Sequence, residues 1–581
     1  MNKTSPAGLD LYTIENSLLA GGFESIFEPY NKLEWLKNSY HDPEKFWTNL
    51  LITKNSFFSW SVKSIPFKKY DFYHDIIVCN RPGNTPALRW FDLFSGWQKI
   101  SYSDIEIQAV KTASAWKSAG ITSGQTICII YPFGKDFIIS LVAALKLGLI
   151  ISQILPQGRS YLQKRLEMLN PEHIATDSTY VSMIPQWKDR IFNTRTLKKY
   201  QESAKISADI DQSHSYNSGD VVFRCFDPSS QTPHIPVDVN ADLAYLCPVR
   251  DALIGMGLGP GDAYAAPGFH FAETQPALIL SGLLTGASFL YLEQKQVFDN
   301  PEILLSCSLK AIGISQKTRD ALIQNPIKSK IEPKDVWKFW FRNPAESSDM
   351  DKWYLFVHRL KLDNTLTGNL KWDACSGGCS MFSIKHAGIP NVNILPSAGV
   401  KWGLADIVNT DLDALGEYGV LYVKPLGKSD KKNIILANMI KKNQDQWIFA
   451  GYNVLGKSGQ HYPLAEVLEV LDNKIQGICC TIVHVPDYEI PVFDLIIFTG
   501  IEKNLDKPGL INNIHNVIEK ELGMEFMPDR IKFFSYYPRH DENRVIEHEW
   551  CRSQYLTGGL YQKSNSEIHQ CIAIIRELIH N

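Results

Sequence analysis

Two short stretches in the C-terminal half of the chain combine residue types that bind flat and charged ligands. Ser376-Gly377-Gly378 closes a short apolar run, and two adjacent glycines let a backbone approach a flat ligand where a Cβ atom would collide. Trp402 and Asp406 bring an aromatic ring and a carboxylate close together in the stretch WGLAD. The ring can stack on a base and the carboxylate can hold Mg²⁺. The glycine pair is either a ligand floor or a tight bend.

The two stretches resemble the paired SGG and YG-x-TE motifs of the adenylate-forming superfamily. This superfamily includes acyl- and aryl-CoA synthetases and the adenylation domains of peptide synthetases. Ala405 replaces the family threonine that meets the α-phosphate, and Asp406 replaces the glutamate that binds Mg²⁺. In the family the glycine turn and the aromatic residue enclose adenine. The resemblance therefore assigns four residues to the nucleotide site: Gly377, Gly378, Trp402 and Gly403.

Residues 227–234 follow a predicted strand and resemble the family's phosphate-binding loop, T-S-G-x-x-G-x-P-K. Ser229, Ser230 and Thr232 are retained in kind, but both glycines are missing and His234 stands where the family has lysine. Forcing a residue other than glycine into the left-handed conformation costs about 1 kcal/mol or more. Histidine is also largely neutral at pH 7. We therefore expect weakened binding of ATP or AMP and Mg²⁺, and impaired adenylation.

Three more positions acquire roles from the resemblance. His270 matches a family histidine between the acyl pocket and the thiol tunnel, although a histidine on an apolar strand is also often part of the core. Gly459 matches a glycine that lines the pantetheine tunnel, which implies CoA or phosphopantetheine as the thiol. Arg544 replaces the catalytic lysine, keeping the charge on a bulkier, planar group. The catalytic candidates are thus Arg544, His270 and Asp406.

Length and composition limit the other possibilities. A chain of 581 residues is too long for one core, and 44% hydrophobic with 21% charged residues is typical of a folded protein. The formal charge of −3 provides no general attraction to phosphate backbones, so nucleic acid is not expected as a partner. Eleven cysteines without C-x-x-C spacing favour a reduced, cytoplasmic location. Residues 1–10 lack the layout of a secretion signal.

The elements that must position these residues are predicted to alternate between strands and helices. Residues 126–131 and 149–155 are expected to be buried strands on either side of a helix at 135–147, which implies parallel pairing in a layered sheet. The apolar stretch 137–155 is therefore not expected to span a membrane. Ser103 and Asp104 are predicted to cap a second helix that ends at Lys117.

The resemblance extends over residues 86–550 and implies an α/β fold. We expect a large N-terminal domain with mixed and parallel sheets and a small, mobile α+β C-terminal domain. The predicted divisions are an N-terminal extension or cover at 1–85, an AMP-binding-like domain at 86–450, the small domain at 451–565 and a terminal helix at 566–581.

Most residues that touch ATP in the family are altered here, and no certain equivalent of its ribose-binding aspartate is found. The first hypothesis is an enzyme that handles an acyl group of unknown type and only transfers it to CoA or to a carrier protein. The second is a pseudoenzyme that binds an acyl chain, a nucleotide or a partner protein and acts as a scaffold for a pathway. The third is an active ligase with replacement residues.

Overall fold

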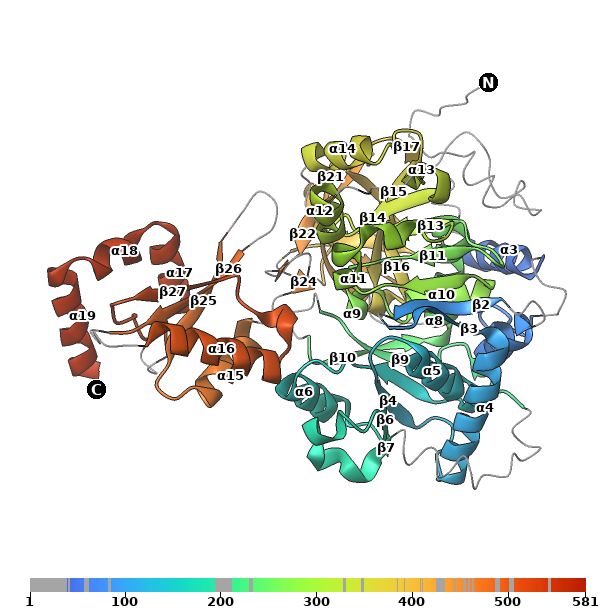
Figure 1. Cartoon of the computed structure of the whole chain (residues 1–581), viewed down its shortest axis with the longest axis horizontal. Coiled ribbons are helices and arrows are strands. Elements are labelled where there is room, and N and C mark those ends of the chain that lie inside the picture. Colours follow the sequence, from blue (N-terminus) through green and yellow to red (C-terminus); the bar gives the residue numbers. More distant parts are fainter. Residues whose placement is uncertain are drawn as a thin grey trace. The chain divides into compact units, whose positions relative to one another are not determined.

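The computed structural model of the chain describes most of the residues from position 39 onward. The described residues are 39, 42–56, 62–81, 85–92, 94–193, 212–228, 233–325, 327, 331–345, 350–383, 385–390, 392–407, 409, 411–424, 434–443, 446–452, 456–457, 460–461, 464–485, 492–500, 506–541 and 545–580. They form two compact units (Figure 1). Unit 1 comprises Met1–Pro156 and Met168–Asn453, and unit 2 comprises Gln157–Glu167 and Val454–Asn581. Both mix helices with sheets, which confirms the predicted fold class.

The smaller sheet of unit 1 has six strands in the order β10-β9-β5-β4-β6-β7. Their bounds are β4 Thr126–Ile130, β5 Ile150–Gln153, β6 His173–Thr176, β7 Ile191–Asn193, β9 Val221–Phe226 and β10 Pro236–Asn240. Strand β4 pairs in parallel with both β5 and β6, as the alternating pattern predicts. Helix α5 (Lys135–Leu147) connects β4 to β5. Within the described residues, no helix has the length and hydropathy needed to cross a bilayer.

Helix α4 (Tyr102–Ser118) begins two residues earlier than predicted. Its N-cap is Ser101 rather than Ser103: the Ser101 side chain accepts from the Asp104 backbone N–H, and the Asp104 carboxylate accepts from Ser101 N–H. This is a capping box. Strand β3 ends at Ser101, so the chain turns directly from strand into helix.

The larger sheet contains β19-β20-β21-β22-β18-β16-β15-β14-β13-β11-β12-β2-β3 in that order. The bounds are β2 Pro86–Asp92, β3 Gly96–Ser101, β11 Ala263–Ala265, β12 Ser288–Tyr291, β13 Ala311–Gly313, β14 Phe339–Arg342, β15 Leu366–Asp373, β16 Gly378–Phe382, β18 Asn393–Pro396, β19 Trp402–Ala405, β20 Tyr418–Val423, β21 Ile434–Asn443 and β22 Gln446–Tyr452. Pairing is parallel from β2 through to β15 and antiparallel from β15 to β16. The SGG turn lies at this change of direction.

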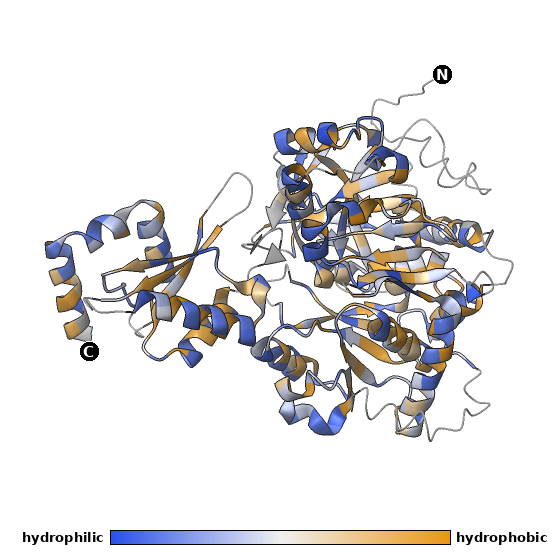
Figure 2. Ribbon diagram, viewed as in Figure 1, coloured by the Kyte–Doolittle hydropathy of each residue, from blue (hydrophilic) through white to orange (hydrophobic). Residues whose placement is uncertain are grey.

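Helix α8 (Ala241–Arg250) lies in the interior of unit 1 and touches both sheets. It contacts β9 and β10 of the smaller sheet, β16 of the larger sheet and helix α10 (Ala277–Thr285). All ten of its residues are buried, as expected for a helix surrounded by protein. Figure 2 shows hydrophobic residues along the strands and along these inner helices. The side chains of α8 are therefore packed against other parts of unit 1.

Helix α3 (Pro43–Ser56) is part of the core of unit 1. Asp42 Oδ1 accepts a hydrogen bond from Lys45 N–H at 3.2 Å, which caps the N-terminus of the helix. Trp47 is fully buried, and its Nε1 donates to the carbonyl oxygen of Gly399 at 3.0 Å. This bond connects α3 to the loop that leads into β19.

Unit 2 has a three-stranded sheet, in which β25 (Cys479–Val485) pairs antiparallel with β26 (Val492–Phe498), and β26 pairs in parallel with β27 (Arg530–Phe534). Its helices are α15 Leu464–Lys474, α16 Lys507–Glu521, α17 His548–Leu556, α18 Gly559–Ser564 and α19 Glu567–His580. Helix α6 (Arg159–Leu169) contributes the buried Arg165, which pairs with the buried Glu466 at 3.4 Å. Unit 2 thus includes a helix from early in the sequence.

Candidate functional site

The turn between β15 and β16 is organised by its own side chains. Asp373 caps a short 3₁₀ turn, because its Oδ1 accepts from the backbone N–H groups of Cys375 at 3.0 Å and Ser376 at 3.2 Å. Gly377 has a φ of +74°, a conformation that residues with a Cβ rarely adopt. The backbone geometry of the turn therefore favours a capping side chain at position 373 and a glycine at position 377.

Both glycines of the turn also permit close packing against α8 and the residues that follow it. A Cβ on Gly377 would lie 2.8 Å from the carbonyl oxygen of Leu243, and a Cβ on Gly378 would lie 2.4 Å from Asp251 Oδ2. The turn is thus a tight bend that approaches another part of the protein. Nucleotide contact at Gly377 and Gly378 stays a prediction.

A buried ion pair holds the turn from the α8 side. Arg250 donates from Nε and Nη2 to Asp251 Oδ1 at 2.9 and 2.7 Å, and both side chains are almost completely buried. Asp251 Oδ2 accepts from Cys379 N–H at 2.6 Å, while Arg250 donates to the carbonyl oxygens of Cys379 at 2.7 Å and Ala398 at 3.1 Å. We call Arg250 and Asp251 the arginine clamp. It connects the SGG turn to the loop that precedes Trp402.

A second ionic group lies at the other end of the turn. Lys371, near the end of β15, approaches Glu273 Oε2 with its Nζ at 3.2 Å, and both side chains are buried. Glu273 belongs to the short helix α9 (Phe271–Thr274), which contacts β15 and the 3₁₀ turn. Asp227 follows β9, and its charge acts on Asp373. We call Asp227, Glu273, Lys371 and Asp373 the carboxylate cluster.

The carboxylate cluster contains three acids and one base, and this imbalance changes the ionisation of Asp373. Burial and the neighbouring charge of Asp227 raise the pKa of Asp373 to about 7, against the opposing effect of Lys371. Perturbed carboxyl groups of this kind are concentrated at functional sites. Asp373 can therefore hold or release a proton near neutral pH.

The segment around His270 borders the carboxylate cluster. His270 is half-buried and directly precedes α9. The neighbouring Phe269 ring makes edge contacts with Phe341, at 5.6 Å between centroids, and with Trp372, at 6.1 Å. The structure therefore brings His270, the SGG turn and the end of β9 into one region of unit 1. The catalytic role of His270 stays a prediction.

The WGLAD stretch forms β19 and the turn after it. The half-buried Trp402 ring meets Trp447 edge-on, with centroids 4.6 Å apart. A Cβ on Gly403 would lie 2.2 Å from the Tyr422 hydroxyl oxygen, so packing of Tyr422 requires glycine there. Asp406 Oδ1 accepts from Asn409 N–H at 2.9 Å. This bond gives Asp406 a local role, and its predicted role as a Mg²⁺ ligand is untested.

Several predicted site residues lie outside the described residues. These are Ser229, Ser230, Thr232, Gly459 and Arg544. His234 is described and is half-buried just before β10. The predicted contacts of these six residues with phosphate, with the thiol or with the reacting carboxylate stay predictions.

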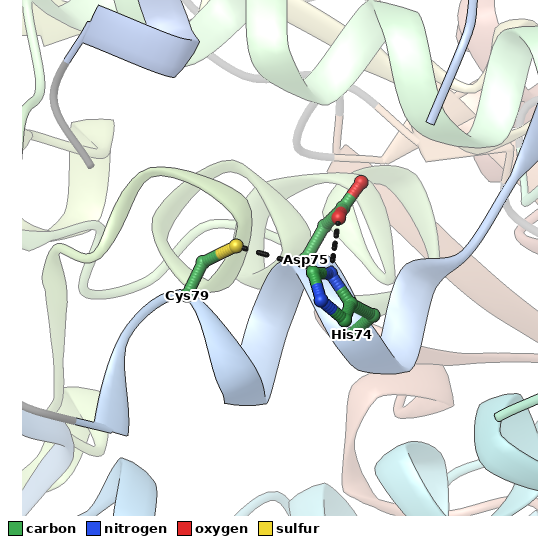
Figure 3. A group of neighbouring side chains, drawn as sticks. All are labelled: His74, Asp75 and Cys79. Atoms are coloured by element: carbon green, nitrogen blue, oxygen red, sulfur yellow. Dashed lines mark hydrogen bonds and ion pairs between the residues drawn. The ribbon is translucent and has the colours of Figure 1, made fainter. Parts of the chain in front are cut away.

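A separate group of potential metal ligands lies on a π-helical turn, His74–Val78, and just after it (Figure 3). His74 Nδ1 is 3.0 Å from Asp75 Oδ1 and 4.0 Å from Cys79 Sγ. The other carboxylate oxygen, Oδ2, accepts from Ser64 Oγ at 2.5 Å and from Tyr245 OH at 2.7 Å. Because both oxygens of Asp75 already accept hydrogen bonds from the protein, we interpret this group as a buried structural network.

The comparisons with known proteins agree with this architecture. Residues 77–247 match the family described as AMP-binding enzyme. A fatty acyl-adenylate ligase from L. pneumophila, solved with acyl adenylate and pyrophosphate, is 12% identical with a TM-score of 0.60 over 84% of this chain and 96% of its own. The family match thus covers residues 77–247, and the structural likeness over most of the chain shows a shared fold.

Two further solved structures share this fold. A double mutant of o-succinylbenzoate CoA synthetase from Bacillus subtilis, bound with a product analogue, is 11% identical with a TM-score of 0.63 over 84% of this chain and 98% of its own. An artificially fused adenylation–PCP di-domain from Klebsiella oxytoca is 14% identical with a TM-score of 0.60 over 82% and 94%. At these identities the likeness shows the fold alone.

One curated protein also matches a part of the chain. A linear gramicidin synthase from Brevibacillus parabrevis is 27% identical over 122 residues, which is 20% of this chain. The match spans only 2% of the length of that synthase. Its activity therefore bears on this chain only as a proposal.

The sequence analysis missed the carboxylate cluster. Lys371 and Asp373 are two residues apart on β15, a spacing that places both side chains on one face of a strand. The spacing of these two charged residues can be recognised in the sequence. Their proximity to Glu273 and Asp227 depends on parts of the chain more than 90 residues away, and no local pattern shows it.

Proposed function

We propose that the chain is a divergent adenylate-forming enzyme that handles an acyl group but has lost efficient ATP-dependent adenylation. It transfers the acyl group from an acyl-adenylate to the thiol of CoA or of a phosphopantetheinylated carrier protein. In that step a carbon–sulfur bond forms, the bond from the carbonyl carbon to the phosphate oxygen breaks, AMP leaves and the thiol gives up its proton. A pathway enzyme that makes the acyl-adenylate is the implied partner.

The charge of the carboxylate cluster supports the first part of this proposal, the loss of efficient ATP-dependent adenylation. Asp227 is the first residue of the segment that resembles the phosphate loop, and its charge already acts on Asp373 within the protein. A triphosphate adds several negative charges at such a place, and their repulsion is stronger in a buried site than in water. His234 supplies no permanent cation in place of the family lysine. These features weaken the binding of ATP and pyrophosphate.

The region around His270 supports the second part of the proposal, the transfer of the acyl group to a thiol. Phe269, Phe341 and Trp372 form an aromatic wall beside α9, and an acyl chain packs well against such rings. His270 adjoins this wall and can accept the thiol proton. Glu273 faces Lys371 in the protein interior, so the ion pair neutralises one carboxylate near the acyl group.

Pyrophosphate exchange tests the loss of adenylation. The full chain is incubated with ATP, Mg²⁺, labelled pyrophosphate and a panel of carboxylic acids, and we expect exchange at background level. His234→Lys combined with Asp227→Asn should raise exchange, because the pair restores a cation and removes an anion. Robust exchange by the natural chain, abolished in Arg544→Ala, would show a complete ligase and refute the proposal.

Acyl transfer is tested by presenting synthetic acyl-adenylates with CoA or a carrier protein. We expect thioester formation that falls at least tenfold in His270→Ala. The exposed His358→Ala serves as a matched control and should transfer at the natural rate. Failure of transfer with every acyl group, together with a stable complex with a pathway enzyme, would indicate a scaffold instead.

A further inference from the structure

A cavity of about 280 Å³ opens at the β3 edge of the larger sheet. Its floor and walls include Arg89, Leu290, Ser306 and Cys307, with Trp97 and Lys99 among the lining residues. Strand β12, which carries Leu290, is separated from β15 by β11, β13 and β14. At about 4.8 Å per strand the distance from the SGG turn is roughly 19 Å, so this cavity is distinct from the site described above.

Two cations stand side by side in the cavity. Arg89 on β2 and Lys99 on β3 are directly opposite each other in the antiparallel register. Side chains so placed point to the same face of the sheet, and like charges there repel each other. The described residues that line the cavity include no acid. The protein therefore holds two positive charges together without its own counter-charge in the lining.

Arg89 is also poorly satisfied by the protein. Its Nε is buried, and among the described residues it makes neither a hydrogen bond nor an ion pair. A buried donor without a partner is energetically unfavourable, so such a group in a native cavity indicates a missing acceptor. Lys99 is exposed and likewise has no anionic partner among those residues. Both observations point to an anion as the occupant.

We propose that this cavity binds a small phosphate monoester. The guanidinium of Arg89 offers a planar fork for two oxygens, and Lys99 adds a second positive charge. A phosphate monoester carries between one and two negative charges at pH 7, which suits two cations better than a single carboxylate does. Leu290 and the partly exposed ring of Trp97 contact its organic part. This site is independent of the acyl-transfer function proposed above.

Calorimetric titration of the full chain with phenyl phosphate, inorganic phosphate and benzoate tests the proposal. At constant ionic strength and pH 8, phenyl phosphate should bind at least tenfold more tightly than benzoate and more tightly than inorganic phosphate. Arg89→Gln should weaken phenyl phosphate at least tenfold, and Lys99→Gln about threefold. Lys111→Gln, a charge change on the exposed face of α4, is the matched control and should bind normally.

Thiol labelling provides a second readout at the same place. Cys307 lines the cavity and is half-buried, so bound phenyl phosphate should slow its alkylation as followed by mass spectrometry. Equal binding by all three variants would place the phosphate elsewhere, in the nucleotide site for example, and would overturn the proposal. Unchanged labelling of Cys307 in the presence of bound ligand would also overturn it. If Arg89→Gln does not fold, the exposed Lys99→Gln decides the outcome.

Discussion

The arginine clamp and the carboxylate cluster both hold the turn between β15 and β16, but they differ in charge balance. The clamp has one cation and one anion, and Cys379 satisfies both through its backbone. The cluster has three acids for one lysine, and Asp373 responds with a raised pKa. The balanced ion pair of the clamp holds the turn in one position. In the unbalanced cluster, the excess negative charge favours the binding of a proton or a ligand. This difference in charge balance favours a functional role for the carboxylate cluster and a structural role for the arginine clamp.

The largest expected effect comes from breaking the clamp. Arg250→Met leaves Asp251 buried without its cation, which should reduce the free energy of unfolding by about 3–5 kcal/mol, as measured in urea. The matched control is Arg319→Met, because Asp320, the partner of Arg319, is 30% exposed and can be hydrated. The control should lose clearly less stability. Equal losses in the two variants would mean that the clamp has no special role.

An intermediate effect is expected from Asp373→Asn. Asn keeps the Oδ1 that caps the turn but removes the charge. The folded pKa of Asp373, about 7, lies above its unfolded value, so its contribution to stability is present at low pH and is lost as the pH rises through 7. The stability of the variant relative to the natural chain should therefore increase by about 2–3 kcal/mol between pH 5 and pH 8, with most of the change below pH 7.

Urea unfolding at pH 5, 6, 7 and 8 measures this difference. The exposed Asp411→Asn is the control, and its difference from the natural chain should not change with pH. A pH-independent difference for Asp373→Asn would contradict the raised pKa and, with it, the imbalance of the carboxylate cluster.

The smallest effect is expected from Glu273→Gln. The charge of Glu273 helps to raise the pKa of Asp373, and Lys371 retains Asp373 as a partner once Glu273 is neutral. Stability at pH 8 should change by less than about 1 kcal/mol. The pKa of Asp373, followed by carboxyl ¹³C NMR, should fall below that of the natural chain. An unchanged pKa would mean that Glu273 is not part of the cluster.

Local signals in the sequence predicted the elements well where the deciding interactions are local. Apolar runs identified β4, β5 and α5. The cap of α4 was assigned to Ser103 instead of Ser101, because two serines precede the same Asp104 and only the end of β3 selects between them. The nucleotide and catalytic assignments rest on resemblance, and five of those residues lie outside the described parts.

The sequence by itself determined the resemblance to the adenylate-forming superfamily, the alternation of strands and helices and the glycines of the turn, because these depend on residue type and short-range spacing. The tertiary structure decided which charges meet. Arg250 reaches Cys379 and Glu273 reaches Lys371 only after distant segments of the chain pack together. Arg89 stands beside Lys99 once β2 and β3 pair. The energy of a buried charge depends on all of its neighbours, and those neighbours are brought together by folding.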